Sequence, residues 1–426
     1  MEEDGQLREE NQRLKRAVEE LSILNELAAS IGGLSSSEEV VRKILSRALR
    51  ALNAEQGVVT LVAERTDNPM RTLVRSMITS SDHPAFHFNS VLLGWMTLYK
   101  RPITINDPAS DQRFGGAVWD PMVRSLVCVP MLIRGGLKGI LTVYNKRNSD
   151  KFTDDDQRLL SIIGAQSAQV IENARLYEEE RALMKIQREL ELASQIQSDL
   201  LPRGEPKMPG YDIAGATFPA RSVGGDFFDF IPIEERKLAL CVGDVSGKGL
   251  PAALLMTNIQ ASLRSEAFLG KRAQECVERM NRQLYHTTGP EKFATLFYGI
   301  LDGANNTLFY CNAGHEQPYM FSGTGEPRRL DIGGTVIGAV DSMSFEGASV
   351  AFDRGDFLVA YSDGVTEAMD PNMVQFGDAR LSRLIRDNAG LRAAELVKLI
   401  ADAVMAHAGN APQHDDITAL VIKRVK

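Results

Sequence analysis

Apolar residues near the start of the chain recur at alternating spacings of three and four. The repeat comprises Leu7, Asn11, Leu14, Val18, Leu21, Asn25 and Ala28. Leucines at d positions and asparagines at two a positions are typical of a short parallel dimeric coiled coil, because a buried Asn selects register and two strands. An amphipathic helix packed on its own domain is the alternative. We predict a coiled-coil helix over residues 1–21 that pairs two copies of the chain.

From residue 22 the pattern changes to alternating helices and strands, which predicts a domain over 22–177. Glu38 to Leu52 is amphipathic, and Gly57 to Ala63 is a β-branched strand. Two further strands, Ser125 to Ile133 and Gly139 to Asn145, flank a glycine turn. Thr153 is then expected to cap a long helix whose first turn is acidic.

A second heptad run follows within the same helix. Its members are Leu183, Ile186, Leu190, Ala193, Gln197 and Leu200. Pro202 disfavours helix at the residue before it, so the helix should end there. We predict a coiled-coil linker over 178–203, with the polar Gln197 at an a position weakening the coil, and a second domain over 204–426.

The 22–177 segment resembles a GAF sensor domain. The resemblance is carried by SLVCVP from Ser125, by GILTVYNK, and by the helix FTDDDQRLLSIIGAQSAQVIENARLY. Asn145, Lys146, Phe152 and Asp156 resemble the NK…F…D element of cyclic-nucleotide-binding GAF domains, although Gln157 replaces its Glu. We predict a structural salt bridge at this element, and the sensor's own ligand, a small molecule or a protein, is unknown.

Composition narrows the function. The 426 residues are 44% hydrophobic and 24% charged, with a net charge of -8 and no Lys/Arg-rich tract, which argues against a nucleic-acid partner. The charged N-terminus lacks the apolar core of a signal peptide, and apolar stretches are too short to span a membrane. The four cysteines include no C-x-x-C pair, so the cytoplasm is the expected compartment.

One cysteine motif is rejected. Cys128 and Arg134 have the spacing of a thiolate phosphatase, C-x-x-x-x-x-R. That chemistry requires a phosphate-binding loop and a lowered cysteine pKa, whereas the intervening residues form an apolar strand.

Four apolar strands of the second domain end or begin with aspartate. The segments are VGGD ending at Asp226, LCVGD ending at Asp244, LVAYSD ending at Asp363, and HDDIT containing Asp415 and Asp416. A single aspartate there is an ordinary turn residue. Four that converge would repel one another unless they bound protons or cations.

Oxygen ligands without Cys or paired His favour hard ions, so we predict two divalent cations, Mg²⁺ or Mn²⁺. A two-metal carboxylate centre suits phosphoester hydrolysis, because it activates a water molecule and neutralises charge on the phosphoryl group. The sequence contains no G-x-S-x-G nucleophile motif, which agrees with a water nucleophile.

These segments resemble the metal-dependent PPM-type phosphatases (the type 2C superfamily), in the bacterial branch of the stage II sporulation and stress-response sigma-factor phosphatases. VGGDFFD, GDVSGKG, ATLFYGILD, NAGHEQP, YSDGVTE and DDIT occur in family order between Leu190 and Lys426. The resemblance implies that Asp244 bridges both metals. It implies that Asp226 and the carbonyl of Val245 bind one metal, and that Asp363 and Asp415 bind the other.

The same resemblance makes Asp416 a supporting residue behind the ligands and offers Arg221 and Lys248 as candidates for binding substrate phosphate. It implies an α/β/β/α sandwich behind an α/β GAF domain. The expected function is a GAF-regulated phosphoserine/phosphothreonine protein phosphatase whose substrate is a STAS-type anti-anti-sigma protein. The alternative is a signalling scaffold with a ligand-binding, cyclic-nucleotide-type GAF domain and vestigial phosphatase activity.

Overall fold

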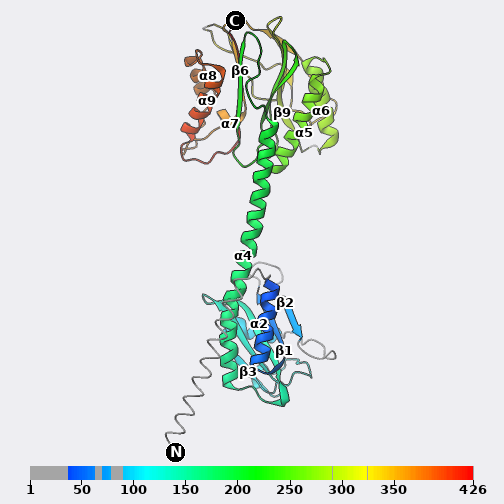
Figure 1. The fold of residues 1–426 in the computed structure, drawn as a ribbon, viewed down its shortest axis with the longest axis vertical. Coiled ribbons are helices and arrows are strands. Elements are labelled where there is room, and N and C mark those ends of the chain that lie inside the picture. The colour runs from blue at the N-terminus through cyan, green and yellow to red at the C-terminus, as the bar shows by residue number, and fades with distance from the viewer. Residues whose placement is uncertain (1–36, 63–69, 78–89, 290, 324, 426) are drawn as a thin grey trace, which may run out of the picture. The chain divides into compact units, whose positions relative to one another are not determined.

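The structure is a computed structural model that describes residues 37–62, 70–77, 90–289, 291–323 and 325–425 (Figure 1). The predicted coiled coil over 1–21 lies outside the described residues. The chain divides into two compact units, with the boundary between Lys185 and Ile186. Within the described residues, no helix has the length and apolarity needed to cross a bilayer.

The first unit is a five-stranded antiparallel sheet with helices. Its elements are α2 (Ser37–Ala51), β1 (Ala54–Val62), β2 (Met70–Met77), α3 (Ser90–Tyr99), β3 (Ile103–Ile105), β4 (Leu126–Ile133), β5 (Gly136–Lys146) and the first part of α4 (Asp154–Leu200). The strand order is β2-β1-β5-β4-β3. The predicted amphipathic helix and both flanking strands of the glycine turn are therefore present, within a few residues of their expected bounds.

Alternation along β4 explains how this sheet has two apolar faces. Val127 and Val129 lie in a core with residues of α2 and α4, whereas Leu126 and Cys128 lie in a second core with α3. Successive side chains of a strand point to opposite faces, so both faces need cover. Burial raises the pKa of the Cys128 thiol to about 12, which disfavours the thiolate.

The helix α4 starts and stops where the sequence predicts. Thr153 Oγ1 accepts a hydrogen bond from Asp156 N, and the Asp156 carboxylate accepts one from Thr153 N, a reciprocal cap. The helix ends at Leu200, two residues before Pro202.

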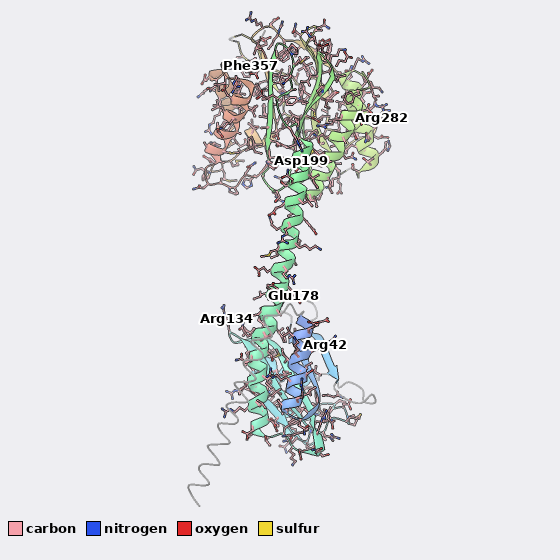
Figure 2. All side chains as sticks on the ribbon, viewed as in Figure 1. Arg42, Arg134, Glu178, Asp199, Arg282 and Phe357 are labelled. Carbon is pink, nitrogen blue, oxygen red and sulfur yellow. The ribbon has the colours of Figure 1, made fainter. Side chains whose placement is uncertain are left out.

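The heptad run on α4 divides into two parts. Leu183 and Ile186 of the run are exposed. So are three other apolar side chains in the part of α4 between Glu178 and Asp199, which Figure 2 labels: Met184, Leu192 and Ile196. Leu190, Ala193 and Leu200 are partly covered, and Gln197 is buried. Gln197 is therefore occupied by contacts within its own chain.

The second unit contains two sheets. Its elements are β6 (Tyr211–Phe218), β7 (Phe227–Glu234), β8 (Lys237–Val245), α5 (Leu250–Ala267), α6 (Ala273–Thr287), β9 (Ala294–Asp302), β10 (Thr307–Ala313), β11 (Tyr319–Phe321), β12 (Arg328–Arg329), β13 (Gly333–Gly334), β14 (Ala348–Ala351), β15 (Phe357–Tyr361), α7 (Asp363–Thr366), α8 (Asp378–Asp387), α9 (Ala393–Ala408) and β16 (Ile417–Arg424). One sheet has the order β13-β10-β9-β8-β7, with β14 on β10, and the other β12-β11-β15-β16-β6. All pairings are antiparallel except β10 with β13.

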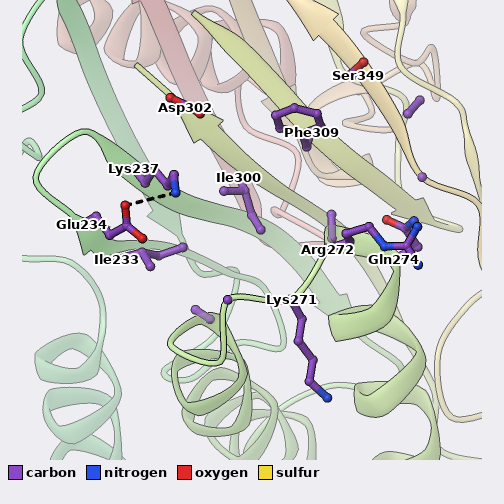
Figure 3. A pocket seen from close by; sticks show the side chains of 15 residues that line it. Ile233, Glu234, Lys237, Lys271, Arg272, Gln274, Ile300, Asp302, Phe309 and Ser349 are labelled. Carbon is purple, nitrogen blue, oxygen red and sulfur yellow. Dashed lines mark ion pairs between the residues drawn. The ribbon is translucent and has the colours of Figure 1, made fainter. Parts of the chain in front are cut away.

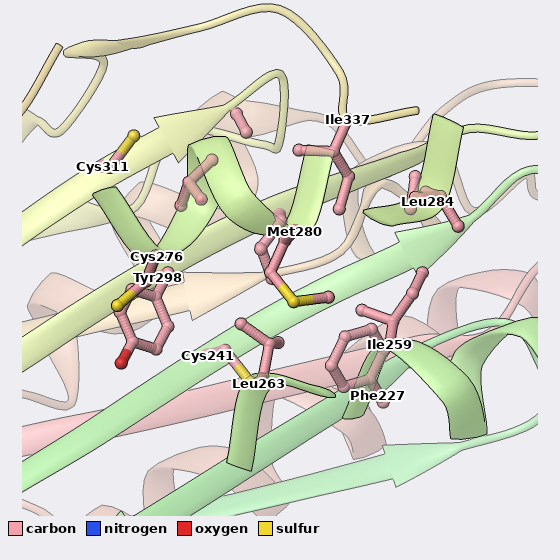
Figure 4. Packing of buried hydrophobic residues seen from close by; sticks show 14 of the residues in the cluster. Phe227, Cys241, Ile259, Leu263, Cys276, Met280, Leu284, Tyr298, Cys311 and Ile337 are labelled. Atoms are coloured by element: carbon pink, nitrogen blue, oxygen red, sulfur yellow. The ribbon is translucent and has the colours of Figure 1, made fainter. Parts of the chain in front are cut away.

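Three cores hold these layers together. On β8, Leu240 and Val242 pack in a core shared with β15 and β16 of the other sheet. Ala239 and Cys241 instead face the core formed with α5 and α6, where Met280 and Ile259 also lie (Figure 4). A third core joins the β15–β16 sheet to α8 and α9. Strands that are apolar on both faces are thus covered on both faces.

Candidate active site

Two of the predicted aspartates lie beside each other at one end of the β7–β8 pair. Asp226 immediately precedes β7, and Asp244 is the penultimate residue of β8. Phe227 pairs with Gly243 in the antiparallel register, which brings the two aspartates together. After burial, the charge of Asp244 is the largest cause that raises the pKa of Asp226, so the two carboxyls interact directly.

The other two aspartates reach the same place from the second sheet. Ser362 follows the last residue of β15, and Asp363 is the first residue of α7. Asp415 lies two residues before the start of β16. Ser362 N donates to Thr418 O, which ties these strand ends together. The sequence-predicted aspartates therefore come from two sheets and meet at one end of the unit.

Their pKa values show that the carboxyls affect one another. Burial, followed by the charges of Asp363 and Asp415, raises the pKa of Asp244 to about 7. Burial and the charge of Asp244 raise the pKa of Asp226 well above its usual range, and burial and Asp415 raise that of Asp363. Like charges that share a desolvated site favour the neutral acid, and a bound cation would reverse that preference.

Asp416 fixes the loop that carries Asp226. Its Oδ1 accepts a hydrogen bond from Ala220 N at 2.8 Å, and its Oδ2 accepts one from Gly225 N at 2.9 Å and one from Asp226 N at 3.3 Å. The side chain is buried, and both of its carboxylate oxygens accept hydrogen bonds from backbone N–H groups. These hydrogen bonds tie the loop that precedes β7 to the segment that precedes β16.

Two hydroxyls that the sequence analysis did not single out orient Asp226. Thr418 Oγ1 donates to Asp226 Oδ2 at 2.7 Å, and Ser362 hydrogen-bonds the same carboxyl. Ser362 Oγ also accepts from Thr418 N. Both residues stand inside recognisable motifs, YSDG and DDIT, so the signal was present but was assigned only to the acids.

Glycines allow the backbone to approach the acids. A Cβ on Gly225 would lie 2.8 Å from the carbonyl oxygen of Val245, and a Cβ on Gly364 would lie 2.0 Å from the carbonyl oxygen of Asp416. Both positions require a residue without a side chain. The Val245 carbonyl thus lies next to the loop of Asp226.

The two candidate phosphate-binding cations differ in their contacts. Lys248 Nζ pairs with Asp415 Oδ2 at 2.8 Å and donates to His414 O. Arg221 is exposed, and a Cβ on Gly249 would lie 4.0 Å from its Nη1, so its guanidinium lies beside the loop that follows β8. Lys248 therefore contacts one of the aspartates, whereas Arg221 lies beside the loop that follows Asp244.

The donor chemistry of this site fits hard divalent cations. The acids present only oxygen atoms, which Mg²⁺ and Mn²⁺ prefer. In the described parts of the chain, however, no group of three or more His, Cys, Asp or Glu side chains is close enough together to hold a metal ion. The aspartates are close enough to raise one another's pKa but would have to move closer to share an ion.

A cavity of about 460 Å³ at the other end of the β7–β8 pair has a different character (Figure 3). It is lined by Glu234 and Lys237, which form an ion pair of 3.1 Å, and by Asp302 at the end of β9. Burial raises the pKa of Asp302, but hydrogen bonds from Asn305 and Ala304 lower it by more, so the net effect stabilises the charged carboxylate. This cavity contains no group of mutually repelling acids.

Known proteins match both units. The GAF domain family model matches residues 35–172, and the model for stage II sporulation protein E (SpoIIE) matches residues 234–425. The chain is 30% identical over 254 residues to phosphoserine phosphatase RsbU of Bacillus subtilis, covering 58% of this chain and 75% of RsbU. The chain belongs to the SpoIIE-type PP2C serine/threonine phosphatases.

Other relatives share less. Protein IcfG of Synechocystis is 31% identical over 263 residues, which cover 55% of this chain but 41% of IcfG. The chain thus spans less than half the length of that relative. The solved SiaA-PP2C domain of Pseudomonas aeruginosa is 23% identical, with a TM-score of 0.49 over 57% of this chain and 98% of the domain. The sequence relatives, and not this likeness, carry the family assignment.

Most of the acidic motifs lie within the region that the SpoIIE model matches. Asp244, Asp363 and Asp415 lie inside the matched region, and Asp226 lies eight residues before it. The family's phosphatases depend on metal ions, which agrees with the oxygen-only donor set.

Proposed function

We propose that this chain hydrolyses phosphoserine or phosphothreonine in a partner protein, using two divalent cations. The observation that carries the proposal is the group of aspartates at one end of the two sheets, one buried and the others partly buried, whose pKa values are raised by burial and by one another's charges. Buried like charges destabilise a fold unless they serve a ligand or a reaction.

In this proposal Asp226, Asp244, Asp363, Asp415 and the Val245 carbonyl hold the cations. Bound there, the cations would supply an activated water molecule and neutralise phosphoryl charge. The remaining work belongs to the protein. Asp416 supports the backbone of the Asp226 loop.

The two cations of the chain complete the site. Lys248 and Arg221 are proposed to attract the phosphate of the substrate and orient it against the carboxylates. Thr418 keeps Asp226 in one rotamer through its 2.7 Å hydrogen bond. Mg²⁺ and Mn²⁺ have the same donor preference here, so the proposal includes both.

Release of inorganic phosphate from a phosphoserine peptide in Mn²⁺ tests the proposal. We expect turnover that requires the metal and is lost in Asp244→Asn. Phosphate release no greater than that of Asp244→Asn would leave the scaffold function, with a vestigial active site, as the better description.

The proposed partner is a phosphorylated STAS-type anti-anti-sigma protein, and the proposed assembly is a homodimer through the coiled-coil helices. Support for the first comes from the relatives, one of which is named phosphoserine phosphatase RsbU. Support for the second comes from the exposed apolar residues of α4, such as Leu183 and Ile186. Dephosphorylation of a purified STAS protein and sedimentation of the full chain test the two separately.

We also propose that the GAF domain controls the active site through α4. Gln197 Nε2 donates to Gly224 O at 2.7 Å, and Gly224 N donates to Gln197 Oε1 at 3.1 Å. Gly224 lies two residues before Asp226, so a shift of this helix end would move a proposed metal ligand. The signal and its sign stay open.

Gln197→Leu tests this coupling. It leaves the buried N–H and carbonyl of Gly224 unpaired, and we expect the Mn²⁺ concentration for half-maximal activity to rise about threefold to tenfold. Gln187→Leu is the matched control, because Gln187 is exposed on the same helix and donates a hydrogen bond to Glu191, one turn away. Equal Mn²⁺ dependence in both variants would contradict the coupling.

A further inference from the structure

A groove of about 470 Å³ opens directly beside the aspartates. Lys248 and Asp415 line one end of it. Its other walls are largely apolar and include Met369, Met373, Met405 and Pro412, from the loop after α7, the end of α9 and the segment before β16. We call it the methionine groove. It is continuous with the candidate active site because the two share Lys248 and Asp415.

One wall of the methionine groove is a tight hairpin held in a single conformation. Met369 and Gln375 form a β-bridge, and Asp370 N donates to Val374 O at 3.0 Å. The Asp370 carboxylate accepts hydrogen bonds from Asn372 N at 2.8 Å and Val374 N at 2.9 Å, which also lower the pKa of that acid. A hairpin tied at these points is pre-organised rather than loose.

The hairpin presents Met373 in an unusual way. Its φ is +63°, in the left-handed region that a bulky residue enters at a cost of about 1 kcal/mol or more, and its side chain is 71% exposed. Neither the backbone strain nor the exposure of a large apolar side chain stabilises the folded state. Such outliers cluster where a ligand is bound.

Two neighbours share this exposure. Val374 is 48% and Met405 41% exposed, although apolar residues of this size are usually buried. Methionine is unbranched and polarizable, so a methionine-lined surface adapts to differently shaped apolar groups. Two acids, Glu367 and Asp415, lie at the rim of the groove beside Lys248. Their charges disfavour an acidic side chain of a bound peptide.

We propose that the methionine groove binds an apolar side chain of the substrate protein, a few residues from its phosphorylated serine or threonine. The inference rests on the proposed function, since the phosphate must lie at the aspartates for the adjoining segment to cross the groove. An extended chain advances about 3.3 Å per residue, so a side chain two to five positions away reaches the neighbouring surface. The groove thereby selects substrates by their flanking sequence.

Three synthetic phosphoserine peptides of thirteen residues test the proposal with the full chain in Mn²⁺. One carries leucines three and four positions before the phosphoserine, the second carries them three and four positions after it, and the third has serines at all these positions. For each protein, kcat/KM for a peptide is divided by kcat/KM for p-nitrophenyl phosphate, which has no flanking residues. We expect one leucine peptide to exceed the serine peptide about tenfold, chiefly through KM.

The variants are Met373→Asn and Met405→Gln. Asn tolerates a positive φ and Gln is an unbranched helix former, so both remove apolar surface with little change in backbone preference. We expect the leucine advantage to fall to about twofold or less in each. Leu269→Ser is the control, because Leu269 is also exposed but follows the far end of α5, and it should keep the full advantage.

The outcomes separate the two proposals. A wild-type chain that hydrolyses p-nitrophenyl phosphate but shows no leucine advantage, or variants that keep it, would overturn the groove and leave the phosphatase standing. Absence of any hydrolysis by the wild-type chain would overturn both. A change in sedimentation caused by Met373→Asn would mean that a second copy of the chain covers the groove, and would likewise overturn the proposal.

Discussion

Two acids of the sensor unit are paired with cationic side chains, whereas in the phosphatase unit Asp226 lies beside a second acid, Asp244. In the first, the Asp156 carboxylate accepts Lys146 Nζ at 2.5 Å together with the N–H of Thr153. A hydrogen bond from Arg113 lowers the pKa of Asp111. In the second, Asp226 is oriented by hydroxyls and faces the acid of Asp244, and its pKa is raised.

The difference teaches where to look for chemistry. Both units place carboxylates at the ends of helices and strands, so position alone does not distinguish them. An acid paired with a cation stabilises the folded state, whereas a cluster of acids destabilises it. Such clusters are typical of sites that bind a ligand or a metal ion. The Lys146–Asp156 pair confirms the structural salt bridge predicted for the NK…F…D element.

Removing one of the uncompensated acids should have the largest effect. For Asp244→Asn we expect kcat/KM for phosphate release in Mn²⁺ to fall about 1000-fold, because the proposed shared ligand of both cations is lost. With chelator present, the free energy of unfolding in urea should rise by about 1 kcal/mol, since a repelling charge has gone. Asp156→Asn is the control and should leave phosphate release intact. A stability loss in Asp244→Asn would contradict the comparison.

The phosphatase unit also holds acids that are paired with cations, and breaking the pair of the fully buried Asp229 should have the next largest effect. Asp229 is fully buried and pairs with Arg264 Nε at 2.6 Å, and Gln260 Nε2 donates to the same carboxylate. Arg264→Leu leaves this charge unpaired, so the free energy of unfolding should fall by about 3–5 kcal/mol. Adding Asp229→Leu should restore part of the loss. A change below about 1 kcal/mol in urea would be inconsistent with a buried charge pair.

Supplying cations should stabilise one unit and not the other. Mn²⁺ at 100 times its dissociation constant should add about 2.7 kcal/mol to the phosphatase unit, because only the folded site binds it. Amide hydrogen exchange resolves the units: protection should increase in β7 and β8 and stay constant in β1 and β5. Equal gains in both units would show that the ion binds elsewhere.

The smallest effect is expected in the sensor. Lys146→Met removes the partner of Asp156, and because this pair is only partly shielded the free energy of unfolding should fall by about 1 kcal/mol. Hydrogen exchange should speed up in the first turn of α4, while hydrolysis of p-nitrophenyl phosphate stays the same. A loss as large as that of Arg264→Leu would remove the contrast between a fully buried acid, Asp229, and a partly covered one, Asp156.

The sequence analysis and the structure agree best where the signal is local. Apolar periodicity located α2, β4 and β5, the Thr153 cap set the start of α4, and Pro202 set its end. The four aspartates were recognisable because each follows or precedes a buried strand. Gln197 shows the limit: its place in a heptad suggested a coil position, but the structure pairs it with Gly224, 27 residues away.

By itself the sequence determined the secondary-structure elements, the two-domain order and the acidic residues, because these depend on neighbours within a few positions. Only the tertiary structure decided which backbone groups Asp416 and Gln197 bind, that Thr418 and Ser362 orient Asp226, and that methionines from α9 and the loop after α7 line one groove. Such contacts join residues up to about 200 positions apart. They arise from the register of strands in two packed sheets, which no local pattern specifies.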